Sequence, residues 1–214
     1  MNNEDNLPAE KINLFALGNS TVGKTSIILR FCKEEFLETY ISTVGIDYLA
    51  KDVTLPDNNK KIKICFYDTA GEEKYKAIAF NLIKSADGIL LMYDITSMKS
   101  FESISEWIKS ILTIKGEDFP IMLIGNKSDL EEKREVDKED GENEAKQNNL
   151  HFYETSNKTG NNVKEAVMDL VKLIVEQNKK KKSKNENNVK NNNVNNNNVK
   201  LNRKEIKKKH KTFC

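Results

Sequence analysis

The chain has 214 residues, of which 37% are hydrophobic and 32% are charged, and its formal net charge at pH 7 is +2. This length and composition allow one packed domain and an extension. They argue against a membrane-spanning helix, because no apolar run approaches the ~20 residues that a bilayer requires. The first residues, MNNEDNLPAEK, have neither a basic start nor an apolar stretch, so we expect no signal peptide.

The small net charge hides two regions of opposite sign. From Asn178 onward the chain carries 13 Lys and Arg against 2 Glu, a balance of +11, and the residues before Asn178 carry 22 basic against 31 acidic residues, a balance of −9. The Asn- and Lys-rich end cannot bury enough apolar surface to fold. We therefore expect a flexible N-terminus over residues 1–10, a folded domain over 11–177 and a disordered tail over 178–214.

Apolar runs and amphipathic stretches alternate along the folded part. The runs predict six β-strands, in chain order at residues 12–17, 49–55, 63–68, 88–94, 121–126 and 151–156. Helical spacing of apolar residues predicts helices over 100–112 and 163–177, and the segment SIILRF, residues 26–31, reads as a further helix start.

The connections between these elements predict the fold class. The turn-forming segment LPDNNKK, residues 55–61, joins two strands directly and predicts a hairpin. The other connections alternate strand and helix. We expect an α/β fold, a mostly parallel six-stranded sheet with one antiparallel edge strand and helices on both faces. Such sheets bind ligands at the carboxyl ends of their strands.

The segment GNSTVGKT, residues 18–25, follows the first strand and precedes a helix start. It fits the phosphate-loop pattern G-x-x-x-x-G-K-[ST], whose glycines let backbone N–H groups point at phosphate oxygens. Lys24 would reach the β- and γ-phosphates, and Thr25 would offer its hydroxyl to Mg²⁺. The expected nucleotide contacts of this loop and helix start are Gly18, Ser20, Thr21, Val22, Gly23, Lys24, Thr25 and Ser26.

The third strand ends in the segment DTAGEEKY, residues 68–75. A carboxylate at Asp68 can hold Mg²⁺ through a water molecule, and the N–H of Gly71 can donate to a γ-phosphate. This segment would therefore complete the phosphate end of the site.

Polar segments at the ends of the fifth and sixth strands predict a purine site. Asp129 can accept two hydrogen bonds from guanine, and adenine would leave a buried carboxylate there unpaired, so ATP would be rejected. The aliphatic parts of Lys127 and Lys158 can cover the base. Asn126 would tie its loop to the phosphate loop. The expected contacts are Asn126, Lys127, Asp129, Ser156, Asn157 and Lys158.

Together these motifs resemble the Ras superfamily of small GTPases, and within it the Rab family, over about residues 11–177. The Rab character lies in YISTVGIDY, YDTAGEEKY, LMYDIT and GNKSDL. The resemblance implies a phosphate-loop GTPase fold and a GTP/GDP switch that binds Mg²⁺ and serves intracellular vesicle-mediated protein transport. Its implied protein partners are effectors, an exchange factor and a GTPase-activating protein.

The resemblance also assigns roles in two switch segments, switch I at about residues 33–46 and switch II at about residues 69–82. Phe36 would pack against the base, Tyr40 would lie near the phosphates, and Thr43 would close over Mg²⁺ and the γ-phosphate. The implied metal residues are Thr25, Thr43 and Asp68, and the implied catalytic positions are Glu72, Thr43 and Lys24.

Several positions depart from the family pattern. Thr21 replaces a usual glycine, and Asn157 replaces an alanine whose backbone N–H contacts guanine. The effector-binding aromatic triad of the family, Phe, Trp and Tyr, corresponds here to Tyr48, Tyr67 and Leu82. Effector choice is therefore expected to be unusual.

Glu72 stands where the family has a glutamine that positions the attacking water. A carboxylate only accepts hydrogen bonds unless it is protonated, and it repels a γ-phosphate. We therefore expect slow GTP hydrolysis. The alternative is a GTP-binding scaffold with little or no hydrolysis. Asp129 argues against a third interpretation, an ATPase.

The three cysteines, Cys32, Cys65 and Cys214, match no zinc or disulfide spacing, which fits a reducing compartment. Cys32 and Cys65 are expected in the core. Cys214 follows a lysine cluster, and the Rab resemblance implies that prenylation machinery attaches a lipid there, although no C-a-a-X box is present. One lipid with nearby lysines would anchor the protein to the cytosolic face of an intracellular membrane. The alternative is a solvated thiol, and no nucleic-acid partner is expected because aromatic residues do not interleave the basic run.

Overall fold

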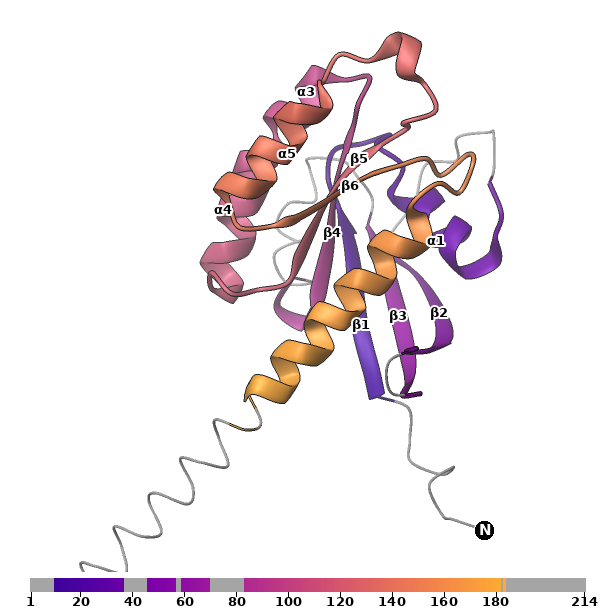
Figure 1. Ribbon diagram of the computed structural model, residues 1–214, viewed down its shortest axis with the longest axis vertical. Helices are drawn as coiled ribbons and strands as arrows, with labels where there is room; N and C mark the ends of the chain where they lie inside the picture. Colours follow the sequence, from indigo (N-terminus) through magenta and orange to yellow (C-terminus); the bar gives the residue numbers. More distant parts are fainter. Residues whose placement is uncertain (1–9, 37–45, 57–58, 70–82, 182, 184–214) are drawn as a thin grey trace, which may run out of the picture. The chain divides into compact units, whose positions relative to one another are not determined.

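The computed structural model describes residues 10–36, 46–56, 59–69, 83–181 and 183 (Figure 1). The chain divides into two compact units, Met1–Ile174 and Val175–Cys214. In chain order the elements are β1 (Glu10–Leu17), α1 (Lys24–Lys33), β2 (Ile46–Thr54), β3 (Lys61–Thr69), β4 (Gly88–Asp94), α3 (Met98–Glu102), α4 (Ile104–Lys115), β5 (Ile121–Asn126), the 3₁₀-helix η3 (Glu131–Lys133), α5 (Lys138–Gln147) and β6 (His151–Thr155). A last helix occupies residues 163–181.

The six strands form one sheet in the order β2-β3-β1-β4-β5-β6. β1 runs parallel to both of its neighbours, and the β4–β5 and β5–β6 pairs are parallel as well. Only β2 is antiparallel, and it pairs with β3 so that Thr54 faces Lys61 across the predicted hairpin. The predicted α/β fold with one antiparallel edge strand is confirmed. The five parallel strands therefore present their carboxyl ends at one edge.

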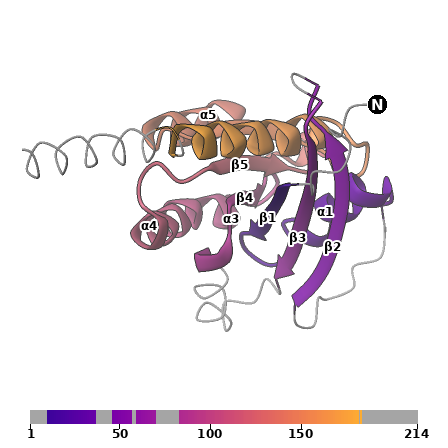
Figure 2. The same ribbon diagram turned by 90° about the horizontal axis from the view of Figure 1, so that it is seen from below.

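Helices cover both faces of this sheet. Every residue of β4 and β5 is buried, as their continuous apolar runs predict. On one face, Ile104 and Ile108 of α4 pack in a cluster with Phe15 and Leu91. On the other face, the ring of Phe31 in α1 meets that of Phe66 in β3 at 5.5 Å. Figure 2 shows α4 and the first part of the last helix, residues 163–174, on opposite sides of the strands.

The structure differs from the sequence prediction in three helices. The segment predicted as one helix over 100–112 is two, α3 and α4, separated at Ser103. The hydroxyl of Ser103 donates to the carbonyl of Lys99, a side-chain bond that competes with regular helix geometry. The last helix continues to residue 181, past the predicted start of the disordered tail at Asn178, because lysine is a good helix former. α5 was not predicted, since Gly141 and Ala145 are its only buried residues.

The described residues include no helix whose length and apolar character would let it span a bilayer.

Candidate nucleotide-binding site

The loop between β1 and α1 passes close to the ends of β4 and β5. Gly18 and Gly23 have positive φ values of 136° and 104°. A Cβ atom at Gly18 would lie 2.1 Å from the carbonyl oxygen of Met92, and one at Gly23 would lie 2.3 Å from Nδ2 of Asn126. Both glycines of the phosphate-loop pattern are therefore required by backbone conformation and by close approach.

Lys24, the first residue of α1, folds back over this loop. Its Nζ donates to the carbonyl oxygens of Gly18 at 3.1 Å and Asn19 at 2.7 Å. The side chain is buried, and this burial lowers the pKa of Lys24 to about 8, while the charge of Asp68 acts in the opposite direction. The ammonium group is thus held inside the loop that is predicted to bind phosphate.

Thr25 and Asp68 meet at the neighbouring strand end. The hydroxyl of Thr25 in α1 donates to Oδ2 of Asp68 in β3 at 2.5 Å. A hydroxyl and a carboxylate are hard oxygen donors, which suit Mg²⁺. The structure therefore brings together two of the three predicted metal residues and fits the metal.

The predicted link between the purine loop and the phosphate loop is confirmed. Nδ2 of Asn126 donates to the carbonyl oxygen of Val22 at 2.7 Å, and its Oδ1 accepts from the hydroxyl of Thr155 at 3.1 Å. Asn157 adds a second link, which the sequence did not predict, since its Nδ2 donates to the carbonyl oxygen of Gly23 at 2.9 Å. The end of β5 and the loop after β6 thus hold consecutive carbonyls of the phosphate loop.

The predicted base-binding residues lie around the same edge. The hydroxyl of Ser156 donates to Oδ1 of Asp129 at 2.6 Å, which orients that carboxylate. Asp129 is exposed, which corrects the expectation of a buried carboxylate. Nζ of Lys127 pairs with Asp94 at 2.5 Å, so its aliphatic part is anchored, whereas Lys158 is exposed. The ring of Phe36 lies 5.9 Å from the guanidinium carbon of Arg30.

The remaining predicted residues of the phosphate loop differ in their surroundings. Val22 is buried and Ser26 is half-buried, whereas Ser20 and Thr21 are exposed. The predicted residues Tyr40, Thr43, Gly71, Glu72, Leu82 and Cys214 lie outside the described residues.

Two further residues hold the site together, and neither was predicted. Arg30 of α1 donates from Nε to the carbonyl of Asn157 and from Nη2 to that of Lys158, both at 2.7 Å. Asn19 donates from Nδ2 to the hydroxyl of Ser103 at 3.0 Å and accepts from Nε1 of Trp107 at 3.4 Å. Their partners are far away in the chain, so no local sequence pattern could reveal these contacts.

The predicted aromatic positions on β2 and β3 are adjacent. The rings of Tyr48 and Tyr67 meet edge to face at 5.4 Å, and Tyr48 is 48% exposed. Tyr67 also stacks on Phe15 at 4.6 Å. Of the two cysteines expected in the core, Cys65 is buried, and Cys32 is only half-buried, which corrects that expectation.

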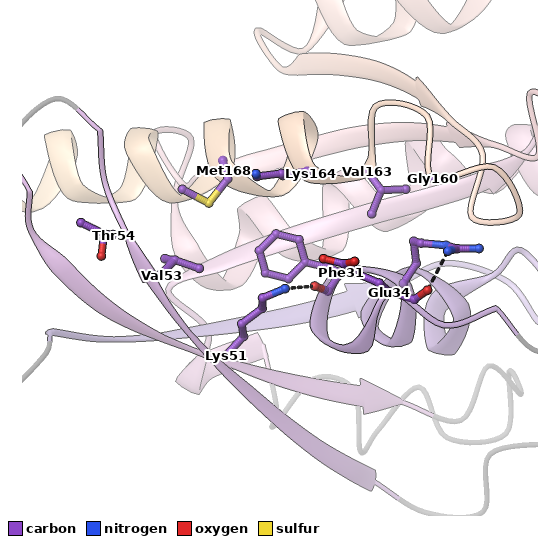
Figure 3. A pocket seen from close by; sticks show the side chains of 10 residues that line it. Phe31, Glu34, Lys51, Val53, Thr54, Gly160, Val163, Lys164 and Met168 are labelled. Carbon is purple, nitrogen blue, oxygen red and sulfur yellow. Dashed lines mark hydrogen bonds between the residues drawn. The ribbon is translucent and has the colours of Figure 1, made fainter.

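A separate groove of about 480 Å³ opens between α1, β2 and the last helix (Figure 3). Phe31 and Met168 face one another across it in Figure 3, with Lys51 and Lys164 nearby. Arg30 lines this groove as well as holding the purine loop. Arg30 therefore connects the groove to the nucleotide-binding edge.

This fold, with a phosphate loop, a hydroxyl–carboxylate pair and two polar purine loops at one sheet edge, defines a phosphate-loop nucleotide-binding protein. The family model for the Ras family matches residues 13–176. The chain is 42% identical over 174 residues to Ras-related protein Rab-10 of Diplobatis ommata, which covers 81% of this chain and 86% of that protein. It is also 42% identical over 174 residues to Ras-related protein Rab-13 of Bos taurus, covering 81% of this chain and 85% of the relative.

A third relative is longer. The chain is 41% identical over 177 residues to EF-hand calcium-binding domain-containing protein 4B of Homo sapiens, which covers 81% of this chain and 24% of that protein. The chain thus spans about a quarter of this human relative. The chain belongs to the Ras family and is a Rab-like small GTPase of the Ras superfamily.

Proposed function

We propose that this protein is a GTP/GDP switch that binds guanine nucleotide with Mg²⁺, hydrolyses GTP slowly and recruits effectors in vesicle-mediated protein transport. The single observation that best supports nucleotide binding is the hydrogen bond from Asn126 to Val22, at 2.7 Å, because it joins a predicted purine loop to the phosphate loop. The family membership supports the switch.

The phosphate end of the nucleotide would be held by the loop over residues 18–25. Lys24 would carry its positive charge to the β- and γ-phosphates, and Thr25, Thr43 and Asp68 would hold Mg²⁺. The metal would neutralise charge on the phosphate oxygens. Gly71 and Tyr40 would lie beside the γ-phosphate.

The purine end would lie among the loops after β5 and β6. Asp129, oriented by Ser156, would accept hydrogen bonds from guanine. The backbone N–H of Asn157 would donate a hydrogen bond to guanine. Lys127, Lys158 and Phe36 would flank the base with apolar surface.

The bound nucleotide is the first test of this function. We expect chromatography of the nucleotide released from purified protein to give GDP or GTP. Calorimetry after nucleotide removal is expected to show much tighter binding of GDP than of ADP, because adenine cannot donate to Asp129. Equal affinities for the two diphosphates would contradict the proposal.

The hydrolysis rate tests the role of Glu72. Its charge near a γ-phosphate would cost about 1–4 kcal/mol at 4 Å, which corresponds to about tenfold to several hundredfold in rate. Single-turnover assays are therefore expected to show faster GTP cleavage by Glu72→Gln than by wild type. Glu73→Gln serves as the neighbouring control with an unchanged rate. Equal rates for Glu72→Gln and wild type would contradict this role.

A scaffold without hydrolysis is the second candidate, favoured by the carboxylate at position 72. It predicts that wild-type protein exchanges GTP for GDP in solution without releasing phosphate. Detectable phosphate release in a single turnover, abolished by Lys24→Ala, would exclude it.

The domain boundaries and the membrane anchor are also proposals. Residues 11–177 would form the GTPase domain and a basic tail would follow it. The structure corrects both predicted boundaries, because Glu10 lies in β1 and residues 178–181 continue the last helix. Prenylation of Cys214 would hold the tail on the cytosolic face of an intracellular membrane. Native protein is expected to partition into detergent, and Cys214→Ser is expected to stay in the aqueous phase; identical partitioning would contradict lipidation.

The protein partners follow from the same proposal. Effectors would bind switch I and switch II beside the exposed Tyr48, whose ring meets that of the half-buried Tyr67 edge to face. An exchange factor and a GTPase-activating protein would set the ratio of the two nucleotide states, and prenylation machinery would modify the tail.

A further inference from the structure

Two carboxamide side chains hold adjacent carbonyls of the phosphate loop. Asn126, at the end of β5, donates to Val22, and Asn157, after β6, donates to Gly23. A Cβ atom at Gly23 would lie 2.3 Å from Nδ2 of Asn126 and 2.7 Å from Nδ2 of Asn157. The two amides therefore lie side by side against the backbone that immediately precedes Lys24.

The loop that carries Asn157 is also fixed to the helix that continues the phosphate loop. Arg30 of α1 donates to the carbonyls of Asn157 and Lys158, each at 2.7 Å. Arg30 holds only the backbone of this loop. The Asn157 side chain is thus the direct hydrogen-bonded connection from this loop to the phosphate loop among the contacts of the described residues.

The Asn157 amide is nearly inaccessible to solvent and only half satisfied. The residue is 3% exposed, and its Oδ1 has no hydrogen-bond partner within the described part of the chain. Replacement by alanine would remove a hydrogen bond and also an unsatisfied buried acceptor, two changes of opposite sign for folding stability. Folding stability is therefore expected to change little, which leaves the effect on the ligand measurable.

We propose that Asn157 is a positioning residue. Its side chain joins the predicted purine loop after β6 to the phosphate loop and slows the release of bound guanine nucleotide. This inference rests on the proposed guanine-nucleotide site. The base is held by the loop after β6 and the phosphates by the loop after β1, so the ligand leaves when these loops part. The Asn157–Gly23 bond must break for them to part. A Rab-type alanine at this position could not form it.

The test is the dissociation rate of a fluorescent GDP analogue from the full chain in excess unlabelled GDP. Loss of one neutral hydrogen bond corresponds to about fivefold in rate, so Asn157→Ala is expected to release the analogue about fivefold faster. Its association rate, and its thermal midpoint measured without nucleotide, are expected to stay close to those of wild type. A structural defect alone would instead lower the thermal midpoint.

Two further variants sharpen the test. Asn157→Asp has the same shape but cannot donate to the Gly23 carbonyl, so it is expected to release the analogue faster than Asn157→Ala; it also tests the proposal if the alanine variant fails to fold. Asn161→Ala is the matched control, because Asn161 is an exposed asparagine of the same connection. Its release rate is expected to equal that of wild type.

The outcomes separate this inference from the proposed function. Faster release from Asn157→Ala and Asn157→Asp, with an unchanged Asn161→Ala, supports the inference. Release from both Asn157 variants within twofold of wild type overturns it and leaves the guanine site standing. A wild-type protein that binds no GDP analogue overturns both.

Discussion

At the scale of single residues, Thr21 has a backbone conformation that its side chain disfavours. Its φ is 64°, in the left-handed region, and it is β-branched. Such a conformation costs about 1–2 kcal/mol relative to glycine. The structure thus explains why a glycine is usual at this position in the Rab family. It places the strained residue inside the phosphate loop.

Thr21→Gly is expected to raise the free energy of unfolding by up to about 1 kcal/mol, because relief of strain exceeds the extra entropy of an unfolded glycine. The thermal midpoint is expected to rise by about 2–4 °C per kcal/mol. Thr21→Ala keeps the Cβ atom and is expected to gain less. A lower midpoint for Thr21→Gly than for wild type would show that the threonine is not strained.

The buried lysine of the site predicts a pH dependence. Without nucleotide, burial lowers the pKa of Lys24 from its ordinary value of 10.5 to about 8. Polyphosphate favours the charged form, so binding above about pH 8 takes up a proton and weakens as the pH rises. The folded protein without nucleotide binds fewer protons than the unfolded chain between these two values, so its stability rises with pH across that window.

Calorimetry of GDP binding at about pH 8 checks this prediction, with two buffers of different ionisation enthalpy. The apparent enthalpy is expected to differ between the buffers for wild type. Lys24→Arg keeps its charge at this pH and is expected to show no such difference. Equal enthalpies for wild type in both buffers would mean that Lys24 is already charged.

At the scale of elements, α5 packs through a glycine rather than through an apolar stripe. A Cβ atom at Gly141 would lie 2.4 Å from the hydroxyl oxygen of Tyr93 and 2.7 Å from Cζ of Phe152. Glycine inside a helix ordinarily costs about 1 kcal/mol relative to alanine. Here it allows α5 to approach β4 and β6 closely.

Gly141→Ala is therefore expected to lower the free energy of unfolding by about 1–2 kcal/mol, because overpacking outweighs the gain in helix propensity. The Tyr93 hydroxyl has no hydrogen-bond partner among the residues described, and burial raises the pKa of Tyr93. Tyr93→Phe is expected to be nearly neutral alone and to restore part of the loss in the double variant. Denaturant unfolding measures this coupling, and additive effects would contradict it.

The elements differ in how far the sequence predicted them. β4 and β5 have the predicted bounds, because strands buried on both faces are apolar throughout. The sequence of α5 shows no apolar pattern, since the helix packs through Gly141, which has no side chain. Each nucleotide-binding motif follows a predicted strand in the sequence, and this order predicted which strand ends form the site. The Asn157–Gly23 bond joins residues 134 positions apart, and side-chain bonds to distant carbonyls leave no trace in local sequence.

At the scale of the whole molecule, the site collects residues from α1, from the ends of β3 and β5, and from the loops after β1, β5 and β6, so a ligand there stabilises most of the sheet. At a GDP concentration of ~1,000 times Kd, the gain in unfolding free energy is about 4 kcal/mol. The thermal midpoint is expected to rise by about 8–16 °C. ADP at the same concentration serves as the control, and an equal rise with ADP would contradict guanine selectivity.

The contact between α4 and the phosphate loop has an optical consequence. Trp107 is the single tryptophan of the chain, and its Nε1 lies 3.4 Å from Oδ1 of Asn19. Indole emission is sensitive to the polarity around Nε1, so unlabelled protein contains an intrinsic reporter beside the loop that Lys24 crosses. Ligand arrival could then be followed by stopped-flow spectroscopy on the native chain.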